Sequence, residues 1–318
     1  MEVRKVNGFF IIFVIGYIGL SVVCASIMAY AQNSGIAVPD WIQYVMSEGI
    51  ILLIAIIYMI VQKIDPIREI PYKRIGIVDV ILSLVAGYCL IPAVLLISNL
   101  SMLFSTNYLE EGTTTLLTYP FAMQVILLAV IPPLVEELIF RGIFFGSYRK
   151  AGMTGAALMS GLLFGCFHLN INQALYAFVM GIVFAYMVEA TGSLFSSVIA
   201  HFAVNTYSIG IVQILKMAGM YAQDGSVSEA FENAESVAGQ STAVTVVQIA
   251  MIAVIAAVFM MLAVLCIRTM AKRHGNLEKM KIQNVKLSHI KNYFTAPVIV
   301  GIVVCVMYMI MLEFSGTL

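Results

Sequence analysis

Long apolar runs separated by short polar stretches dominate this chain. A run of roughly 20 apolar residues is long enough to cross a lipid bilayer as a helix. Nine such runs occur along the sequence, at about 7–31, 41–62, 76–100, 116–147, 153–169, 171–189, 193–216, 242–267 and 294–313. The pattern predicts an all-α, polytopic integral membrane protein with about nine transmembrane helices.

The first apolar run has some features of a cleaved signal peptide. It follows Arg4 and Lys5 and ends in Ala29-Tyr30-Ala31, a small-residue pattern that a signal peptidase accepts. The apolar stretch from Phe9 to Ala29 is longer than the 7–15-residue core of a signal peptide. We therefore expect an uncleaved first span.

Composition supports a membrane protein and limits the function classes. Hydrophobic residues make up 61% of the 318 residues and charged residues 11%, whereas soluble domains carry about 25% charged residues. The formal net charge is zero, which gives no reason to expect a nucleic-acid partner. The cysteines lie in apolar runs without metal-ligand spacing, so we expect apolar packing at Cys24, Cys89, Cys166, Cys266 and Cys305.

Charge patterning orients the spans. With nine crossings, the basic clusters at 4–5, 63–74, 149–150 and 268–291 all fall on one side of the membrane. The other side is mostly acidic: Asp40, Glu110, Glu111, Asp224, Glu229, Glu232, Glu235 and Glu313. By the positive-inside rule, the N-terminus is cytoplasmic and the C-terminus lies outside. We expect a multi-pass protein of the plasma membrane, with a bacterial source as the default.

The chain divides into three segments. Residues 1–115 are expected to hold N-terminal transmembrane helices, 116–216 a four-helix core, and 217–318 the remaining spans with two polar stretches. Residues 218–241 are acidic and are expected to form an external loop with a short helix. Residues 269–293 are basic with interspersed apolar residues, a pattern typical of a helix lying on an anionic leaflet.

Three ionisable side chains interrupt the run from Phe121 to Phe145. Each charge in a bilayer costs about 2.5–3.5 kcal/mol on insertion scales, so such groups pair or face a polar cavity. Glu137 and Arg141 are four apart on a helix, with the acid first, which favours an ion pair. Glu136 points about 100° away from Glu137, so it needs a partner from elsewhere in the chain. A buried structural ion network is the alternative to a functional site.

Two histidines also lie in apolar runs. Phe164 and His168 share one helix face, and His201 and Asn205 share another, because each pair is four residues apart. Glu136 and His168 lie sixteen positions on either side of Gly152, which places both about 24 Å from the expected turn. His201 is only about 14 Å from its own turn, a mismatch that closes if the Glu136 helix protrudes by two turns. The other two, His274 and His289, are expected to be solvated.

Glutamate, histidine and asparagine together support two kinds of hydrolysis. A carboxylate and an imidazole can hold and deprotonate water, while a second imidazole and an amide donate to an oxyanion. Alternatively, Glu136, His168 and His201 bind one divalent metal such as zinc and leave a position open for water. The sequence lacks the His-Glu-x-x-His zinc-protease motif.

Taken in order, the three motifs resemble those of the CPBP family. The motifs are Glu136-Glu137-x-x-x-Arg141, Phe164-x-x-x-His168 and His201-x-x-x-Asn205, within about residues 120–212. That family comprises the CAAX-processing type II prenyl proteases and the bacteriocin-processing or Abi proteins, and it includes lysostaphin-resistance-like proteins.

The resemblance implies an all-helical intramembrane endopeptidase, glutamate-dependent or metallo, that acts on a membrane-associated peptide or protein. It implies that Glu136 and His168 activate water, that His201 and Asn205 form the oxyanion side, and that Glu137 and Arg141 order the site. Nothing in the sequence indicates prenylation chemistry, so a prenylated substrate is not carried over.

Two other classes stay open from the residues alone. A secondary transporter or proton channel would use Glu136, Glu137, His168 and His201 as a proton relay, but transporters usually show internal repeats and we find none. A non-catalytic membrane adaptor or immunity protein on the same fold would not need the motif positions intact.

Overall fold

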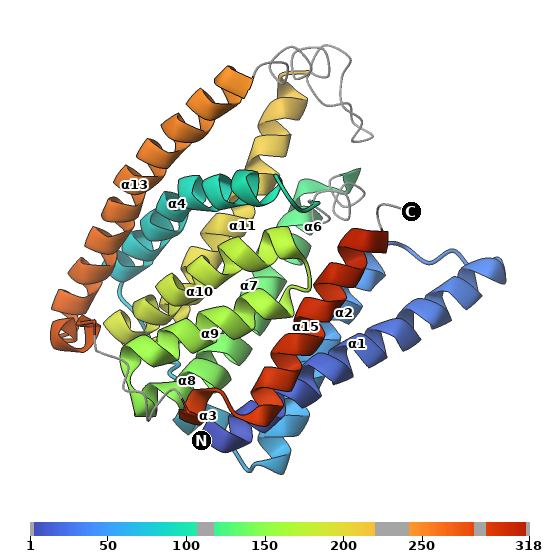
Figure 1. Ribbon diagram of the computed structural model, residues 1–318, viewed down its shortest axis with the longest axis horizontal. Helices are drawn as coiled ribbons and strands as arrows, with labels where there is room; N and C mark the ends of the chain where they lie inside the picture. The colour runs from blue at the N-terminus through green and yellow to red at the C-terminus, as the bar shows by residue number, and fades with distance from the viewer. Residues whose placement is uncertain (1–2, 107–117, 220–241, 283–290, 316–318) are drawn as a thin grey trace.

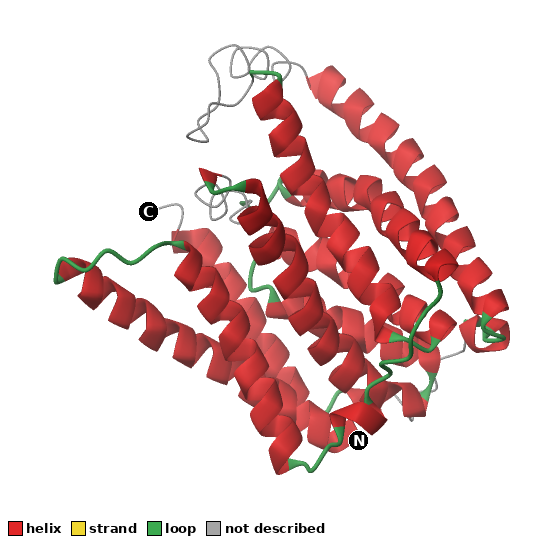
Figure 2. Ribbon diagram, turned by 180° about the vertical axis from the view of Figure 1, so that it is seen from behind, coloured by secondary structure: helices red, strands yellow, loops and turns green. Residues whose placement is uncertain are grey.

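The structure is a computed structural model that describes residues 3–106, 118–219, 242–282 and 291–315. These residues form helices joined by short loops (Figure 2), and the contact of strand type among them is a single bridge between Tyr72 and Ser193. Eight helices are long and apolar enough to cross a membrane. The prediction of an all-α polytopic membrane protein is confirmed.

The helices follow the expected apolar runs closely. The fourth run is one continuous helical stretch, from Phe121 to Ala151, made of several segments. In chain order the helices are α1 (Val3–Asn33), α2 (Trp41–Val61), α3 (Pro66–Glu69), α4 (Ile77–Ser101), α6 (Phe121–Gln124), η2 (Val125–Val130), α7 (Ile131–Glu137), η3 (Leu138–Phe145), α8 (Gly146–Tyr148), η4 (Arg149–Ala151), α9 (Met153–Phe167), α10 (Ile171–Thr191), α11 (Leu194–Met217), α13 (Thr242–Arg273), η5 (Leu277–Met280) and α15 (Ala296–Ser315).

The expected fifth span is the exception in length. Residues 153–169 give α9, a helix of 15 residues, which at 1.5 Å per residue is about 22 Å long. That is shorter than the hydrocarbon core of a bilayer, about 30 Å. Helix α9 packs along α10 inside the bundle, and most of its residues are buried. Protein rather than lipid therefore surrounds much of this helix.

The first and last helices run in the same direction. Asn7 near the start of α1 donates to the Tyr293 carbonyl (3.0 Å) and to Thr295 Oγ1 (2.9 Å), just before α15 begins. Tyr148 donates to the Asn7 side-chain oxygen at 2.6 Å, so the end of the fourth span meets them there. The two helices end on the opposite side of the bundle (Figure 1). Within the described ranges the structure thus has eight helices of membrane-spanning length and the shorter α9.

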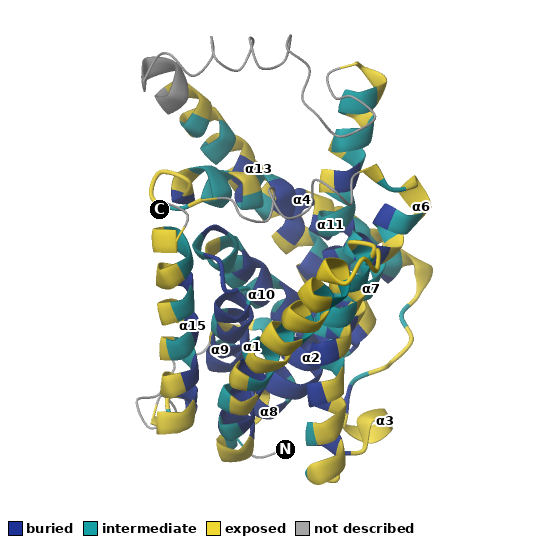
Figure 3. Cartoon of the chain, turned by 90° about the vertical axis from the view of Figure 1, so that its right-hand side faces the viewer, coloured by how far each residue is buried: buried dark blue, intermediate teal, exposed yellow. Residues whose placement is uncertain are grey.

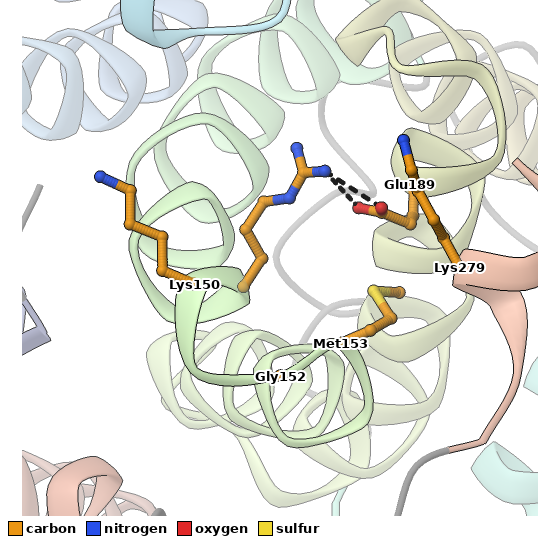
Figure 4. A pocket seen from close by; sticks show the side chains of 6 residues that line it. Lys150, Gly152, Met153, Glu189 and Lys279 are labelled. Atoms are coloured by element: carbon orange, nitrogen blue, oxygen red, sulfur yellow. Dashed lines mark hydrogen bonds and ion pairs between the residues drawn. The ribbon is translucent and has the colours of Figure 1, made fainter.

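Basic residues gather at the end of the bundle where α1 begins. Arg149 forms an ion pair with Glu189 of α10 at 2.8 Å, and the two line an open pocket with Lys150 and Lys279 (Figure 4). The predicted clustering of the basic segments at one end is therefore present in the fold. Which side of the membrane this end faces stays a prediction.

Helix α13 is anchored at this basic end by a buried carboxylate. Arg273 Nε lies 3.1 Å from Asp79 Oδ1, and His274 Nε2 lies 3.0 Å from Asp79 Oδ2. The prediction that His274 is solvated is wrong, since only 17% of its side chain is exposed. The cause is that α13 packs along α4, which brings the end of α13 onto the first turn of α4.

Burial is concentrated in the middle of the chain. The helices that follow the fourth run, α9 and α10, are largely buried, whereas the outer faces of α1, α13 and α15 expose apolar side chains (Figure 3). Such surfaces suit contact with lipid. Much of the core therefore lies in the segment that carries the three sequence motifs, and the inner faces of α1, α2 and α15 pack against it.

Two expectations for polar segments are tested little or not at all. Residues 220–241 of the acidic segment lie outside the described residues. Within the basic segment, α13 continues to Arg273 and is followed by the short η5, so the described part forms no long surface helix. The predicted boundaries at 115 and 216 stay a prediction.

Candidate active site

The fourth span changes helix type around the paired glutamates. The seven residues of α7 lie between two π-helical segments, η2 and η3, and π-helical turns are frequent at functional sites. Pro132 and Pro133 lack the backbone N–H groups that would bond to carbonyls one turn earlier. The Leu128 carbonyl, four and five residues before them, accepts instead from Asn205 Nδ2 of α11 at 3.0 Å. The motif asparagine thus ties α11 to the break in this helix.

Glu137 and Arg141 form the ion pair that their spacing predicts. Arg141 Nη1 donates to Glu137 Oε1 at 2.8 Å, and both side chains are fully buried. A charge-assisted hydrogen bond inside a low-dielectric core is strong, but each partner is costly to leave alone there. The pair therefore fixes both side chains in one geometry.

Aromatic rings enclose the Arg141 guanidinium. Its carbon Cζ lies 4.3 Å from the centre of the Phe164 ring and 5.2 Å from that of Phe184, so the cation is stabilised by ring faces as well as by the carboxylate. Gly181 of α10 leaves the space this requires, because a Cβ there would lie 3.1 Å from Arg141 Nη2 and 2.6 Å from the Gly161 Cα. The glycine is thus part of the cavity that holds the arginine.

His201 connects the two glutamates. Its Nδ1 lies 3.1 Å from Glu137 Oε1 and its Nε2 lies 3.7 Å from Glu136 Oε2. A carboxylate can only accept, so Nδ1 carries the proton in the first contact. The expected difference in depth between His201 and Glu136 is absent, since the structure places His201 beside both Glu136 and Glu137.

Glu136 has the opposite environment from its neighbour. Its side chain is 14% exposed, and among the described residues it accepts no hydrogen bond. Its nearest cationic candidate is His201 Nε2 at 3.7 Å, and Glu48 of α2 interacts with it electrostatically. The expected partner from elsewhere in the chain is therefore a histidine, with a second carboxylate close by.

His168 lies at the end of α9 and faces its own helix. Its Nδ1 lies 2.7 Å from the Phe164 carbonyl, which is left without a helical donor at the helix end. Since a carbonyl only accepts, Nδ1 carries the proton and Nε2 remains available as an acceptor. No hydrogen bond joins His168 to Glu136. Phe164 links it to the site instead, because the centre of its ring lies 4.6 Å from that of the His168 ring and 5.8 Å from that of the His201 ring.

The structure thus brings Glu136, Glu137, Arg141 and His201 into one cluster, with Phe164 and His168 beside it. Asn205 contacts the backbone of the same span at Leu128, about two turns before Glu136. Among the described residues, no group of three His, Cys, Asp or Glu side chains is arranged to hold a metal ion. The metal alternative through Glu136, His168 and His201 stays a prediction.

Three residues around the cluster were not found from the sequence. Phe184 and Gly181 lie on α10, in an apolar stretch where nothing marks them as different from packing residues. Glu48 did carry a signal, because it is the charged residue of an otherwise uncharged 21-residue span. A lone charge in a span indicates function by default.

Comparison with known proteins places this cluster in a family. Residues 118–207 match the family model described as type II CAAX prenyl endopeptidase Rce1-like. The Bacillus subtilis (strain 168) protein described as "Putative membrane peptidase YdiL" is 32% identical over 88 residues, which cover 27% of this chain and 36% of that protein. No solved structure matches. The resemblance seen in the three motifs is confirmed for this part of the chain, since residues 118–207 match that family model.

Proposed function

We propose that the protein is an intramembrane endopeptidase that hydrolyses a peptide bond of a membrane-associated protein or peptide. The observation that supports this most directly is the contrast at the Glu136-Glu137 step. Glu137 is held by Arg141 and His201, whereas Glu136 is partly exposed and accepts no hydrogen bond from the described residues. A base that activates water must have an oxygen free to take a proton, and the groups around it must hold it in position.

In this proposal Glu136 takes a proton from the attacking water and later gives it to the leaving amine. His168 assists with the unprotonated Nε2 that its bond to Phe164 leaves free. His201 and Asn205 form the oxyanion side, as the family resemblance implies. Because Nδ1 of His201 already donates to Glu137, donation from Nε2 to the oxyanion requires a proton on both ring nitrogens.

Asn205 combines this proposed role with a second one. One hydrogen of its amide is bound to the Leu128 carbonyl, and an amide nitrogen carries two donors. The bond orients the side chain and leaves one donor for the oxyanion. The role of Asn205 at the oxyanion is part of the proposal. A cytoplasmic N-terminus is a separate part of it.

Glu136→Gln tests the proposal. The amide has the same shape but takes no proton from water, so cleavage should fall by the general-base contribution, about 10²–10⁴-fold, with folding unchanged. His168→Ala should fall as far, since groups that act as a unit are not additive. The measurement compares the membrane-bound peptides of a deletion strain with those of a Glu136→Gln strain, and the same uncleaved precursor should accumulate in both.

A Glu136→Gln strain with the peptide profile of the wild type would overturn the proposal and favour a non-catalytic adaptor. Chelation separates the two forms of catalysis. Loss of activity with a chelator and recovery with zinc would assign the water activation to a metal, and the same Glu136, His168 and His201 would then be its ligands.

A further inference from the structure

One face of α2 carries a row of polar side chains that leads into the bundle. Asp40, Tyr44 and Glu48 are spaced by four residues, so they lie one above another along the helix. Asp40 is exposed at the helix start, whereas Tyr44 and Glu48 are partly buried. The row therefore runs from the surface toward the site.

The inner end of this row is an uncompensated carboxylate. The oxygen Oε2 of Glu48 is buried and has no hydrogen-bond partner in the described part of the chain. The charged or titratable groups that interact with Glu48 from other helices are Tyr17 of α1 and Glu136 of α7, and neither is a cation. A buried carboxylate without a partner is costly.

The neighbouring cations are only partly engaged. Arg141 is bound to Glu137 through Nη1, while its Nε and Nη2 have no hydrogen-bond partner in the described part of the chain. Among the described residues, no hydrogen bond or ion pair joins Arg141 or His201 to Glu48. The ring nitrogen nearest to Glu136 is that of His201 at 3.7 Å. Glu48 and Glu136 interact electrostatically across the packed helices α2 and α7, and His201 lies between Glu136 and Glu137. This arrangement favours a positively charged group supplied from outside the chain.

Charge at the ends of the bundle points to the direction from which this group comes. Helix α2 begins at the end opposite the basic one, since α1 starts at the basic end and crosses before it. Asp40 lies at that opposite end, and so does Glu313, which accepts from the Thr106 N–H. Lys216 in the last turn of α11 is a cation at the same end, so these described residues leave an excess of one negative charge. Such an excess attracts a cationic segment and repels an anionic one.

We propose that Glu48 binds a lysine or arginine side chain of the peptide substrate beside the bond that Glu136 attacks. The inference rests on the proposed endopeptidase function and names its substrate class: membrane peptides with a basic residue near the cleaved bond. Asp40 and Tyr44 form the path along which the basic side chain enters, the tyrosine offering a ring face to the cation.

The test uses the full-length protein in lipid nanodiscs and one apolar single-span peptide in three versions. The versions carry Lys, Gln or Glu at one position, which is moved along the peptide in successive sets. At one position, the wild type should cleave the Lys version at least about tenfold better than the Gln version, and the Glu version least. The reason is that a site built for a charged partner discriminates against a peptide that lacks the charge. Binding of the same peptides is measured by fluorescence anisotropy.

Glu48→Gln should remove the preference by raising KM for the Lys peptide while leaving the Gln peptide unchanged. Glu48→Lys should reverse the preference toward the Glu peptide. Ser47→Ala on the same turn of α2 is the matched control and should keep the wild-type order, because Ser47 bonds to Tyr17 and not to the pair.

The two proposals fail in different ways. Equal binding and equal cleavage of all three peptides by the wild type would overturn the role of Glu48. This result is expected if a proton held between Glu48 and Glu136 neutralises the pair, so that no cation from the substrate is needed. Preferential binding of the Lys peptide without cleavage would support the role of Glu48 and count against the endopeptidase. An unchanged preference in Glu48→Gln would also overturn the inference.

Discussion

The protein contains the same three chemical groups in two places, a carboxylate bound by a guanidinium and an imidazole. In the candidate site Glu137 contacts Arg141 and His201, and both members of the ion pair are fully buried. At the basic end Asp79 contacts Arg273 and His274, with 44% of the arginine exposed. The carboxylate is buried in both, so the difference lies in how far its cations reach water.

This difference separates two uses of one arrangement. In the site, ring faces and a glycine-lined space hold the arginine where water does not reach it, so its position is fixed and its charge is not screened. At the basic end, the cations keep part of their hydration and join the last turn of α13 to the first turn of α4. In the proposed function the first cluster fixes the geometry beside Glu136, and the second holds two helices together.

Removing the arginine of the buried cluster should have the largest effect. Arg141→Ala leaves Glu137 as an unpaired charge, a loss of about 3–5 kcal/mol when a buried pair is broken from one side. Arg141→Ala combined with Glu137→Gln should recover much of the folding, since the stranded charge is gone. Thermal unfolding in detergent and membrane expression level measure both, and equal stability of all three proteins would contradict the pairing.

A smaller but selective effect is expected from the glycine beside the arginine. Gly181→Ala places a methyl group against Arg141 Nη2 and the backbone of α9, and overpacking of this kind costs about 1–3 kcal/mol. Peptidase activity should fall with stability because the arginine and Glu137 shift together. Gly210→Ala is the control, since nothing lies within 4 Å of a Cβ there; if it lowers stability equally, the tight fit at Gly181 is irrelevant.

A substitution in the Asp79 cluster at the basic end should give the smallest change in stability. Asp79→Asn removes the charge but keeps the shape, and pairs with partly exposed members are worth roughly 0–1 kcal/mol. The loss should shrink at high salt, because salt screens exposed charges, whereas the Arg141→Ala defect should persist. Unfolding measured at low and high salt checks this, and a salt-independent loss as large as that of Arg141→Ala would erase the distinction between the clusters.

The sequence was most informative where partners lie one turn apart. Glu137 and Arg141 meet within a single helix, so their spacing was enough, and the order of the three motifs indicated the family. The Asp79–His274 contact joins residues 195 positions apart, and no local pattern carries that information. The apolar runs predicted the helices, but the shortness of α9 depends on packing against α10.

Other features of the site depend on the three-dimensional fold. Asn205 binds the Leu128 carbonyl because two prolines further along the helix remove its usual donors, a relation between separate helices that spacing alone does not show. The direction of the His168 ring depends on where α9 ends. Glu48 was visible as a lone charge, but its proximity to Glu136 follows from the packing of α2 against α7.

The hydrogen bonds of Asn7 have a consequence for how the protein is made. This side chain enters the membrane with the first helix, yet its partners Tyr148, Tyr293 and Thr295 are synthesised 141, 286 and 288 residues later. Until then its amide has no partner from these positions. The hydrogen bonds to Tyr293 and Thr295 can therefore form only after residue 295 has been synthesised, so the anchoring of the start of α1 to α15 is a late step of assembly.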